Sequence, residues 1–410
     1  LDGGAHHGVA DAPERAELGV MVSVQLLDVG SRLGFPEDEA RALFEQGRMV
    51  AAGDPRALAA LHGVYGRFRA VNLGDMRGWL DLGREAVRLA DQAGDRELRL
   101  AAHVMLIMPL QHLGRTEEAL DLVEATLGEG TRGATMIFGF SPTVFALASR
   151  GFVRAARGRP LDGLADLERA LAEAEGREPA DLLAIIHGGF IAVAGVLGDE
   201  TMAMAHAQRV MALAASAPSQ HVEQQARWCL GEVHLTRGEW GDAVAAVEQG
   251  LALEREAPVA AWRLPSNLAM LAEAHGGAGN TERARTLATQ AIDVAQERGL
   301  RLQEIRAQLA LARVLLRADP AGARVEIETA LARAEALTEE TGLLSNAPFI
   351  HLGRAALARA NGDEVGRRRE LGEAHRLFTE MGATARAEQV ARELGSSVES
   401  TSEISSTSRT

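Results

Sequence analysis

The sequence predicts an all-α protein, built as an α-solenoid of about eight helical hairpins. Apolar residues make up 47% of the chain but aromatic residues only 4%, so alanines fill many apolar positions and let helices approach closely. A small residue follows most of the repeated glycines by five positions, where the two helices of a hairpin would cross. The glycines themselves return about every 40 residues at one point of a helical pattern, a period typical of stacked repeats: they are Gly74, Gly114, Gly158, Gly198, Gly238, Gly279 and Gly362.

The first 53 residues come before the repeats. Residues 1–11 are rich in glycine and histidine, and we expect them to be disordered. Apolar residues at helical spacing from about Ala12, and three acidic residues directly after Pro36, predict an N-terminal helical hairpin over residues 12–53.

The repeats are expected over residues 54–394, each as a helix, a short glycine turn and a second helix. Glycine at the turn supplies the left-handed conformation that favours the end of a helix. Five positions later, Ala243 and Ala284 mark the closest approach of two helices, and Gly163 is smaller still. Small residues also precede the turn glycine by seven positions, as at Gly151.

Some segments depart from this pattern. Trp79 stands where the first unit should have a small residue, and the turn near Pro320 uses proline in place of glycine. The apolar residues Met136, Phe138 and Phe140 in the loop 128–142 are expected to pack over their hairpin, the alternative being that they close one end of a groove. Residues 395–410 are rich in serine and threonine and are expected to form a disordered tail.

Small residues at both spacings resemble those of the tetratricopeptide repeat (TPR) from about Asp54 to Leu394. The resemblance implies a right-handed TPR-like α-solenoid, with helices longer than usual because the family's common period is 34 residues. Three stretches, residues 34–41, 139–142 and 362–383, are similar to the C-terminal helical region of bacterial signalling proteins. In those proteins a class III adenylate or guanylate cyclase domain and a STAND-type ATPase precede the repeats. The helical arm of large ATP-binding LuxR-family regulators is also similar.

Composition excludes several kinds of chemistry on this chain. All 43 basic residues are arginine, so no P-loop lysine and no Schiff-base lysine exist here. The one cysteine, Cys229, allows neither an internal disulfide nor a multi-cysteine zinc site. The motifs HExxH, Walker A and GxSxG are absent, and the scattered histidines lack a second ligand at helical spacing. We therefore expect no catalytic residue, no metal and no cofactor.

The net charge and the hydropathy of the chain argue against nucleic acid and membranes as direct partners. The formal net charge of −14 opposes direct binding of nucleic acid, and the triplet Arg367–Arg369 is surrounded by glutamates that can pair with it along one helix. Leu182 to Gly198 is apolar, but it is shorter than a bilayer span and contains three internal glycines. We expect it to be a repeat helix, with no membrane contact.

The concave face of such a solenoid, lined by first helices, is the expected partner-binding groove. Counting back from each turn glycine selects residues that would face it, with the aromatic ones as anchors or, alternatively, as ordinary core. This candidate set contains Met108, Gln111, His112, Phe145, Phe152, Gln225, Trp228, Glu232, Ser266 and Glu273.

The functional expectation is a non-catalytic, cytoplasmic interaction or sensor arm of a multidomain bacterial signalling ATPase or nucleotide cyclase. It would bind a protein or peptide in the groove, or contact upstream domains of the same polypeptide, since a chain that begins at Leu1 is expected to be a fragment. Two alternatives stay open: a stand-alone adaptor that binds peptides, and the effector-binding arm of a LuxR-type transcription activator.

Overall fold

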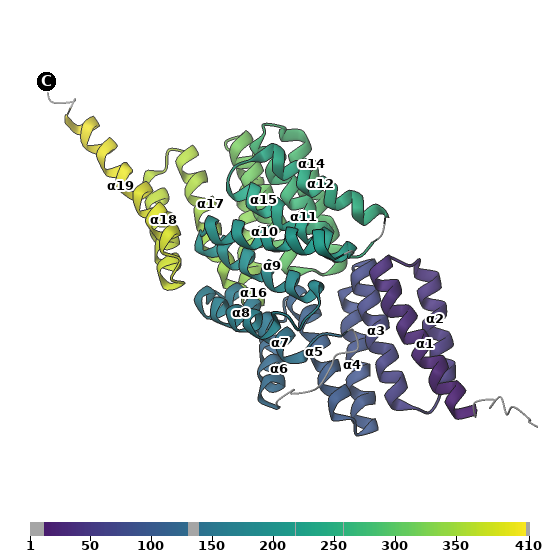
Figure 1. Cartoon of the computed structure of the whole chain (residues 1–410). Helices are drawn as coiled ribbons and strands as arrows, with labels where there is room; N and C mark the ends of the chain where they lie inside the picture. The colour runs from purple at the N-terminus through teal and green to yellow at the C-terminus, as the bar shows by residue number, and fades with distance from the viewer. Residues whose placement is uncertain (1–11, 130–138, 218, 257, 407–410) are drawn as a thin grey trace, which may run out of the picture.

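The computed structural model describes residues 12–129, 139–217, 219–256 and 258–406, and these residues form a right-handed TPR-like α-solenoid without strands (Figure 1). Residues 1–11 and 407–410, and with them part of the expected disorder, lie outside the described residues, as do Met136 and Phe138. The helices pair in chain order into hairpins. They are α1 Ala12–Leu33, α2 Glu37–Val50, α3 Pro55–Leu73, α4 Met76–Ala93, α5 Arg96–His112, α6 Thr116–Glu129, α7 Pro142–Ala156, α8 Pro160–Ala174, α9 Ala180–Leu197, α10 Glu200–Ser216, α11 Gln220–Thr236, α12 Trp240–Glu256, α13 Leu264–Gly277, α14 Thr281–Arg298, α15 Arg301–Ala318, α16 Arg324–Thr341, α17 Ala347–Ala360, α18 Glu364–Glu380 and α19 Thr384–Ser406. Two short 3₁₀ segments, η1 Ala261–Arg263 and η2 Leu344–Asn346, precede α13 and α17.

The glycine turns form as the sequence predicts. All seven repeated glycines have φ between 71° and 84°, the left-handed region in which a side chain is strained. Aspartates cap several of the helices that follow: the Asp199 carboxylate accepts from Met202 N at 2.8 Å, and Asp363 accepts from Gly366 N at 2.8 Å. A second series of left-handed glycines, which the repeat pattern did not reveal, ends second helices at Gly94, Gly299, Gly342 and Gly382.

The predicted close crossings are also confirmed. A Cβ placed on Gly163 in α8 would lie 2.4 Å from the carbonyl oxygen of Gly151 in α7, so the two glycines allow the backbones to touch. In the first unit the large Trp79 is accommodated because Gly66 faces it: a Cβ there would lie 2.8 Å from Trp79 Cδ1.

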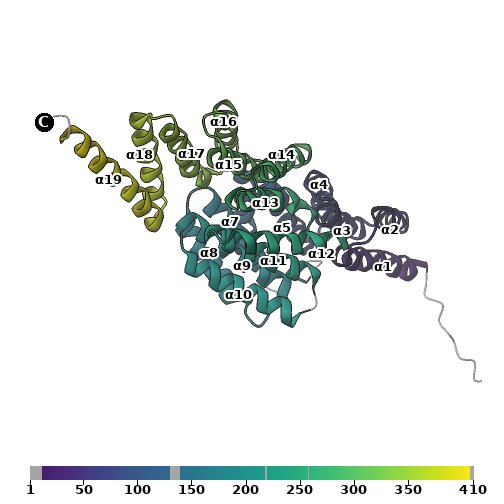
Figure 2. The same cartoon turned by 90° about the horizontal axis from the view of Figure 1, so that it is seen from above.

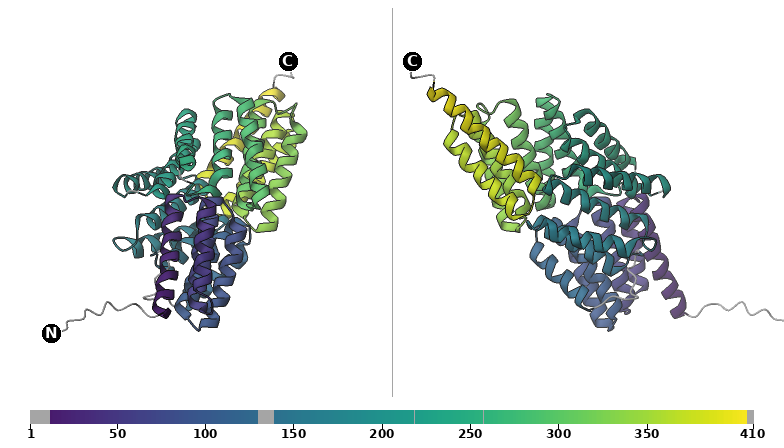
Figure 3. Two further views of the ribbon diagram at one scale, coloured as in Figure 1. Left: turned by 90° about the vertical axis from the view of Figure 1, so that its right-hand side faces the viewer. Right: turned by 60° about the vertical axis from the view of Figure 1, so that its left-hand side comes forward.

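The superhelix winds far enough for its later hairpins to lie against its earlier ones (Figures 2 and 3). Helix α15 contacts α5, and α19 contacts α9. Hydrogen bonds join these successive turns: Thr116 Oγ1 donates to Thr341 O at 2.6 Å, and Asn72 Nδ2 donates to Pro258 O at 2.6 Å. The concave face is therefore narrow and partly filled by the protein itself.

Three segments differ from expectation or bear on it. The tail that was expected to be disordered is helical as far as Ser406, where α19 ends. Serine has a low helix propensity, but this preference is too weak to end a helix by itself. Helix α16 begins at Arg324, so Pro320 belongs to the turn. Among the described residues, α9 is the one helix apolar and long enough to cross a membrane, but 56% of it is buried in the fold, as the first helix of its hairpin.

Candidate binding cavity

The inner side of the superhelix encloses a cavity of about 640 Å³. One wall comes from α1, α3, α4, α5 and α7. The other comes from the connection before α9, the starts of α9 and α11, and the connection before α13. Its apolar lining includes Trp79, Met105, Met108, Phe145 and Trp262. The cavity therefore presents mostly apolar surface, as ligand sites do.

Of the candidate groove residues, Met108 and Phe145 line this cavity. The other eight do not line it: Gln111, His112, Phe152, Gln225, Trp228, Glu232, Ser266 and Glu273. The reason is that the superhelix closes on itself and its own side chains occupy much of the concave face.

Hydrogen bonds and ion pairs show how the central groove is filled. Gln303 Nε2 of α15 donates to His112 Nδ1 at 2.7 Å, and Gln111 Nε2 donates to Ser149 O at 3.2 Å. Burial, with the nearby positive charge of Arg263, lowers the pKa of His112 to about 3, so the ring is neutral.

The glutamates and the remaining glutamine of the set are paired as well. Glu232 forms an ion pair with Arg306, and Glu273 forms one with Arg313 at 2.9 Å. Gln225 accepts a hydrogen bond from Arg263. Glu273 thus joins the neighbouring hairpins of α13 and α15, and Glu232 joins α11 to α15, two hairpins further along the chain.

Charged groups gather at one side of the cavity. Arg67 of α3 forms an ion pair with Asp28 of α1 at 2.5 Å, and Asp28 also pairs with Arg32 at 2.7 Å. On the facing wall, the Asp181 carboxylate accepts from Ser219 Oγ at 3.0 Å. Burial lowers the pKa of the neighbouring His221 to about 4, which keeps this ring neutral too.

Two buried indoles in the lining have unused hydrogen-bond donors. Trp79 is 3% exposed and Trp262 is 8% exposed, yet neither Nε1–H finds an acceptor among the described residues. A buried donor without an acceptor costs about 1–3 kcal/mol, and both Nε1 atoms are themselves covered in this structure, so a ligand's acceptor would reach them only after the lining side chains move.

A buried positive charge lies behind one of these indoles. The guanidinium of Arg263 is 4.5 Å from the centre of the Trp262 ring and 5.1 Å from that of Trp228. Arg263 is 8% exposed and has no ion pair with a carboxylate in the described part of the chain. Burial lowers its pKa to about 10, which leaves it charged.

Counting back from each turn glycine does not select Trp79, Trp262, Arg67 or His221, because that rule covers only one set of first-helix positions. Trp262 lies in η1, between two helices, where the repeat pattern gives no position to count. Trp79 was visible as a departure from the small-residue rule, and that departure was the available signal.

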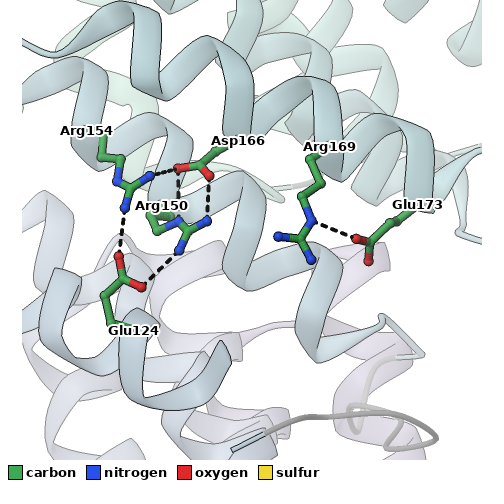
Figure 4. Close-up of polar contacts among 6 residues, drawn as sticks. All are labelled: Glu124, Arg150, Arg154, Asp166, Arg169 and Glu173. Carbon is green, nitrogen blue, oxygen red and sulfur yellow. Dashed lines mark hydrogen bonds and ion pairs between the residues drawn. The ribbon is translucent and has the colours of Figure 1, made fainter. Parts of the chain in front are cut away.

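A four-residue ion network near the outer surface has a structural role (Figure 4). Asp166 of α8 is buried and accepts two hydrogen bonds from Arg150, at 2.6 and 2.9 Å, and one from Arg154, at 2.9 Å. Glu124 of α6 closes the network by pairing with both arginines at 2.9 Å. Since each of these charges is paired, the network joins three helices.

A group of possible metal ligands lies at the turn between α11 and α12. The ligand atoms of His234, Glu239 and Asp242 all lie within 4.8 Å of one another. His234 Nδ1 lies 2.6 Å from Glu239 Oε2, and Arg237 Nε lies 3.1 Å from the other oxygen of the same carboxylate. An arginine at this distance opposes a second cation.

Comparison with known proteins shows similarity in architecture alone. No family model matches the chain, and no curated protein matches its sequence. A solved Rap protein in complex with competence and sporulation factor is 11% identical, with a TM-score of 0.48, over 95% of this chain and 99% of that chain. The apo quorum sensor NprR from B. thuringiensis is 14% identical, with a TM-score of 0.44, over 94% of this chain and 99% of that one. A STAND protein with a tetratricopeptide repeat sensor from Pyrococcus horikoshii is 12% identical, with a TM-score of 0.42, over 88% of this chain and 55% of that one. Similarity at this level transfers neither a ligand nor an activity.

Proposed function

We propose that this chain is a non-catalytic arm that binds a peptide segment of a partner in the cavity. The observation that carries the proposal is the cavity itself: its lining is mostly apolar, with charged groups along one side, and it includes two indoles, Trp79 and Trp262, whose Nε1–H donors have no acceptor among the described residues. A peptide supplies carbonyl oxygens as acceptors and apolar side chains for the surface of Met105, Met108 and Phe145.

The polar groups of the cavity support binding over catalysis. Asp28 is held by Arg67 and Arg32, and Asp181 accepts from Ser219. Glu178 accepts a hydrogen bond from the backbone N–H of Ser141 at 3.1 Å. Carboxylates engaged in this way orient the cavity walls, and a general base would need a freer carboxylate next to a nucleophile.

The test is selection of ligands from a phage-displayed library of random peptides, followed by calorimetry with the selected peptides. Met108→Trp should fill the cavity and weaken their binding at least about tenfold, which is about 1.4 kcal/mol. Met49→Trp is the matched control, because Met49 is 70% exposed on α2 and does not line the cavity. Failure to select any peptide, or equal binding by both variants, would refute the proposal.

For the parent protein, we propose a cytoplasmic sensor arm of a multidomain bacterial signalling ATPase or nucleotide cyclase. The support is the family resemblance of residues 34–41, 139–142 and 362–383, together with hydrogen bonds between successive superhelical turns. A ligand that prefers one spacing of these turns would shift an upstream switch through that preference. Sequencing the gene upstream of the Leu1 codon tests this: an in-frame cyclase or P-loop domain is expected, and a start codon directly upstream would instead favour a stand-alone adaptor.

A small effector is the second candidate ligand, as in the arm of a LuxR-type activator. The cavity volume of about 640 Å³ favours it, because small-molecule sites commonly measure about 300–1,000 Å³. A thermal-shift screen with metabolites separates the two: stabilisation by a metabolite that Met108→Trp abolishes, with no peptide selected, would favour the effector.

A further inference from the structure

The outer face of α1 carries a stripe of exposed apolar side chains. Leu18, Val22, Leu26, Val29 and Leu33 are between 39% and 60% exposed, and they follow one another at spacings of three or four residues. Such spacing places them on one side of a helix, in the pattern by which helices pair with each other.

Helix α1 belongs to the first hairpin, at the N-terminal end of the superhelix (Figure 1). Helix α1 packs on α2 and α3 through its opposite side, where Leu27 is fully buried. The terminal unit of a solenoid normally turns a polar face outward, as α19 does with Glu388, Gln389 and Arg392. The N-terminal end differs from this rule, since its outer face is apolar.

The stripe is symmetric along the helix. Positions 18, 22, 25, 26, 29 and 33 map onto themselves when the order is reversed: Leu18 exchanges with Leu33, and Val22 exchanges with Val29. At the centre, Gln25 exchanges with Leu26. An antiparallel copy of the same helix would therefore place Leu18 on Leu33 and Val22 on Val29, with Leu26 against Gln25 at the centre.

We propose that this face is a homodimer interface in which α1 packs antiparallel to α1 of a second copy, about a two-fold axis near residues 25 and 26. A two-fold interface uses the same patch on both subunits, and the reversal symmetry of the stripe is what such a patch requires.

The exposed area is close to what a dimer needs. With Met21, the exposed parts of the stripe amount to roughly 500 Å² of apolar side chain, at the upper end for a monomer's largest patch. The exposed flanks of Gln25 and Arg32 bring it to roughly 700 Å², against about 800 Å² per partner in a standard interface. Gln25 and Arg32 also line the cavity, so the dimer would set the two cavities beside its axis.

The first experiment is light scattering coupled to size-exclusion chromatography of the full chain. A mass twice the 43.5 kDa of one chain is expected, falling to one chain in Val22→Glu. The matched control is Val325→Glu on α16, which adds the same charge at a residue that is 75% exposed and outside the stripe, and should remain a dimer. A monomeric wild-type chain, or a dimer in Val22→Glu, would overturn the proposal.

A mixing experiment tests the antiparallel register. Val22→Glu and Val29→Arg should each be monomeric alone and form a heterodimer when mixed, because position 22 of one copy would face position 29 of the other. A heterodimer of Val22→Glu with Val22→Arg, without one between Val22→Glu and Val29→Arg, would show parallel packing and refute the register. Leu18→Glu with Leu33→Arg repeats the test at the ends of the stripe, so no single variant decides it. These readouts involve no peptide, so they are independent of the proposed function.

Discussion

Replacing Gly163 by alanine should destabilise the protein, although alanine is the better helix former. Gly163 lies in the first turn of α8, where that helix crosses α7. The new Cβ would lie 2.4 Å from the carbonyl oxygen of Gly151 and 3.0 Å from both the backbone N and the Cβ of Ala155. Two of these three atoms belong to the backbone and cannot rotate away.

The magnitude follows from two opposing terms. Alanine in place of a helical glycine gains about 0.5–1 kcal/mol of helix stability. Ordinary contact of a Cβ begins near 3.4 Å, so the helices must separate by close to 1 Å, and overpacking of this kind costs about 1–3 kcal/mol. The expected net loss of unfolding free energy is about 0–2.5 kcal/mol, and the 2.4 Å approach to a backbone oxygen favours the upper part of that range.

The assay is urea unfolding followed by far-UV circular dichroism. Gly372→Ala is the matched control, since Gly372 lies within α18 and a Cβ there would have no atom within 4 Å. Its midpoint should rise, by about 0.5–1 kcal/mol in free energy, while that of Gly163→Ala should fall. A Gly163→Ala midpoint at or above the wild-type value would refute the close crossing of α7 and α8.

Ala243→Leu and Ala284→Leu should each overpack a fully buried helix crossing and cost about 1–3 kcal/mol, and unchanged urea midpoints in both would contradict the repeat register. Asp166→Asn removes one carboxylate from two arginines and should lower the unfolding free energy by about 3 kcal/mol, measured in the same assay. Burial lowers the pKa of His112 to about 3, below the 6.5 of the unfolded chain, so its contribution to stability is complete above about pH 6.5 and is lost as pH falls from there toward 3. The variant His112→Gln should therefore show a flatter fall of thermal midpoint below pH 6.5, and a slope equal to that of the wild type would show that His112 does not titrate as inferred.

Much of the fold could be predicted from short-range features. Glycine at Gly238 or Gly279 ends a helix because its own backbone tolerates positive φ, whatever surrounds it. The crossing of α7 and α8 follows from two small residues, Gly151 and Gly163, which lie 12 positions apart in the chain. These features act within one hairpin, and that is why a repeat pattern reveals them.

The candidate site could be predicted only in part. Met108 and Phe145 were selected because they lie on first helices, and they do line the cavity. His112 satisfies the same rule, but its ring accepts a hydrogen bond from Gln303, which lies 191 residues away in the sequence. His112 is therefore buried and does not line the cavity. Trp262 was not selected, because the segment that carries it belongs to no repeat position.

The sequence by itself determined the hairpins, their turns and the stacking of neighbours, because each depends on residues within about one repeat of one another. The tertiary structure decided how tightly the array winds. Small rotations between hairpins accumulate until Thr116 meets Thr341, and no local pattern encodes that sum. The same winding narrows the groove and buries Arg263 beside the cavity. It leaves the apolar face of α1 exposed at the N-terminal end of the superhelix.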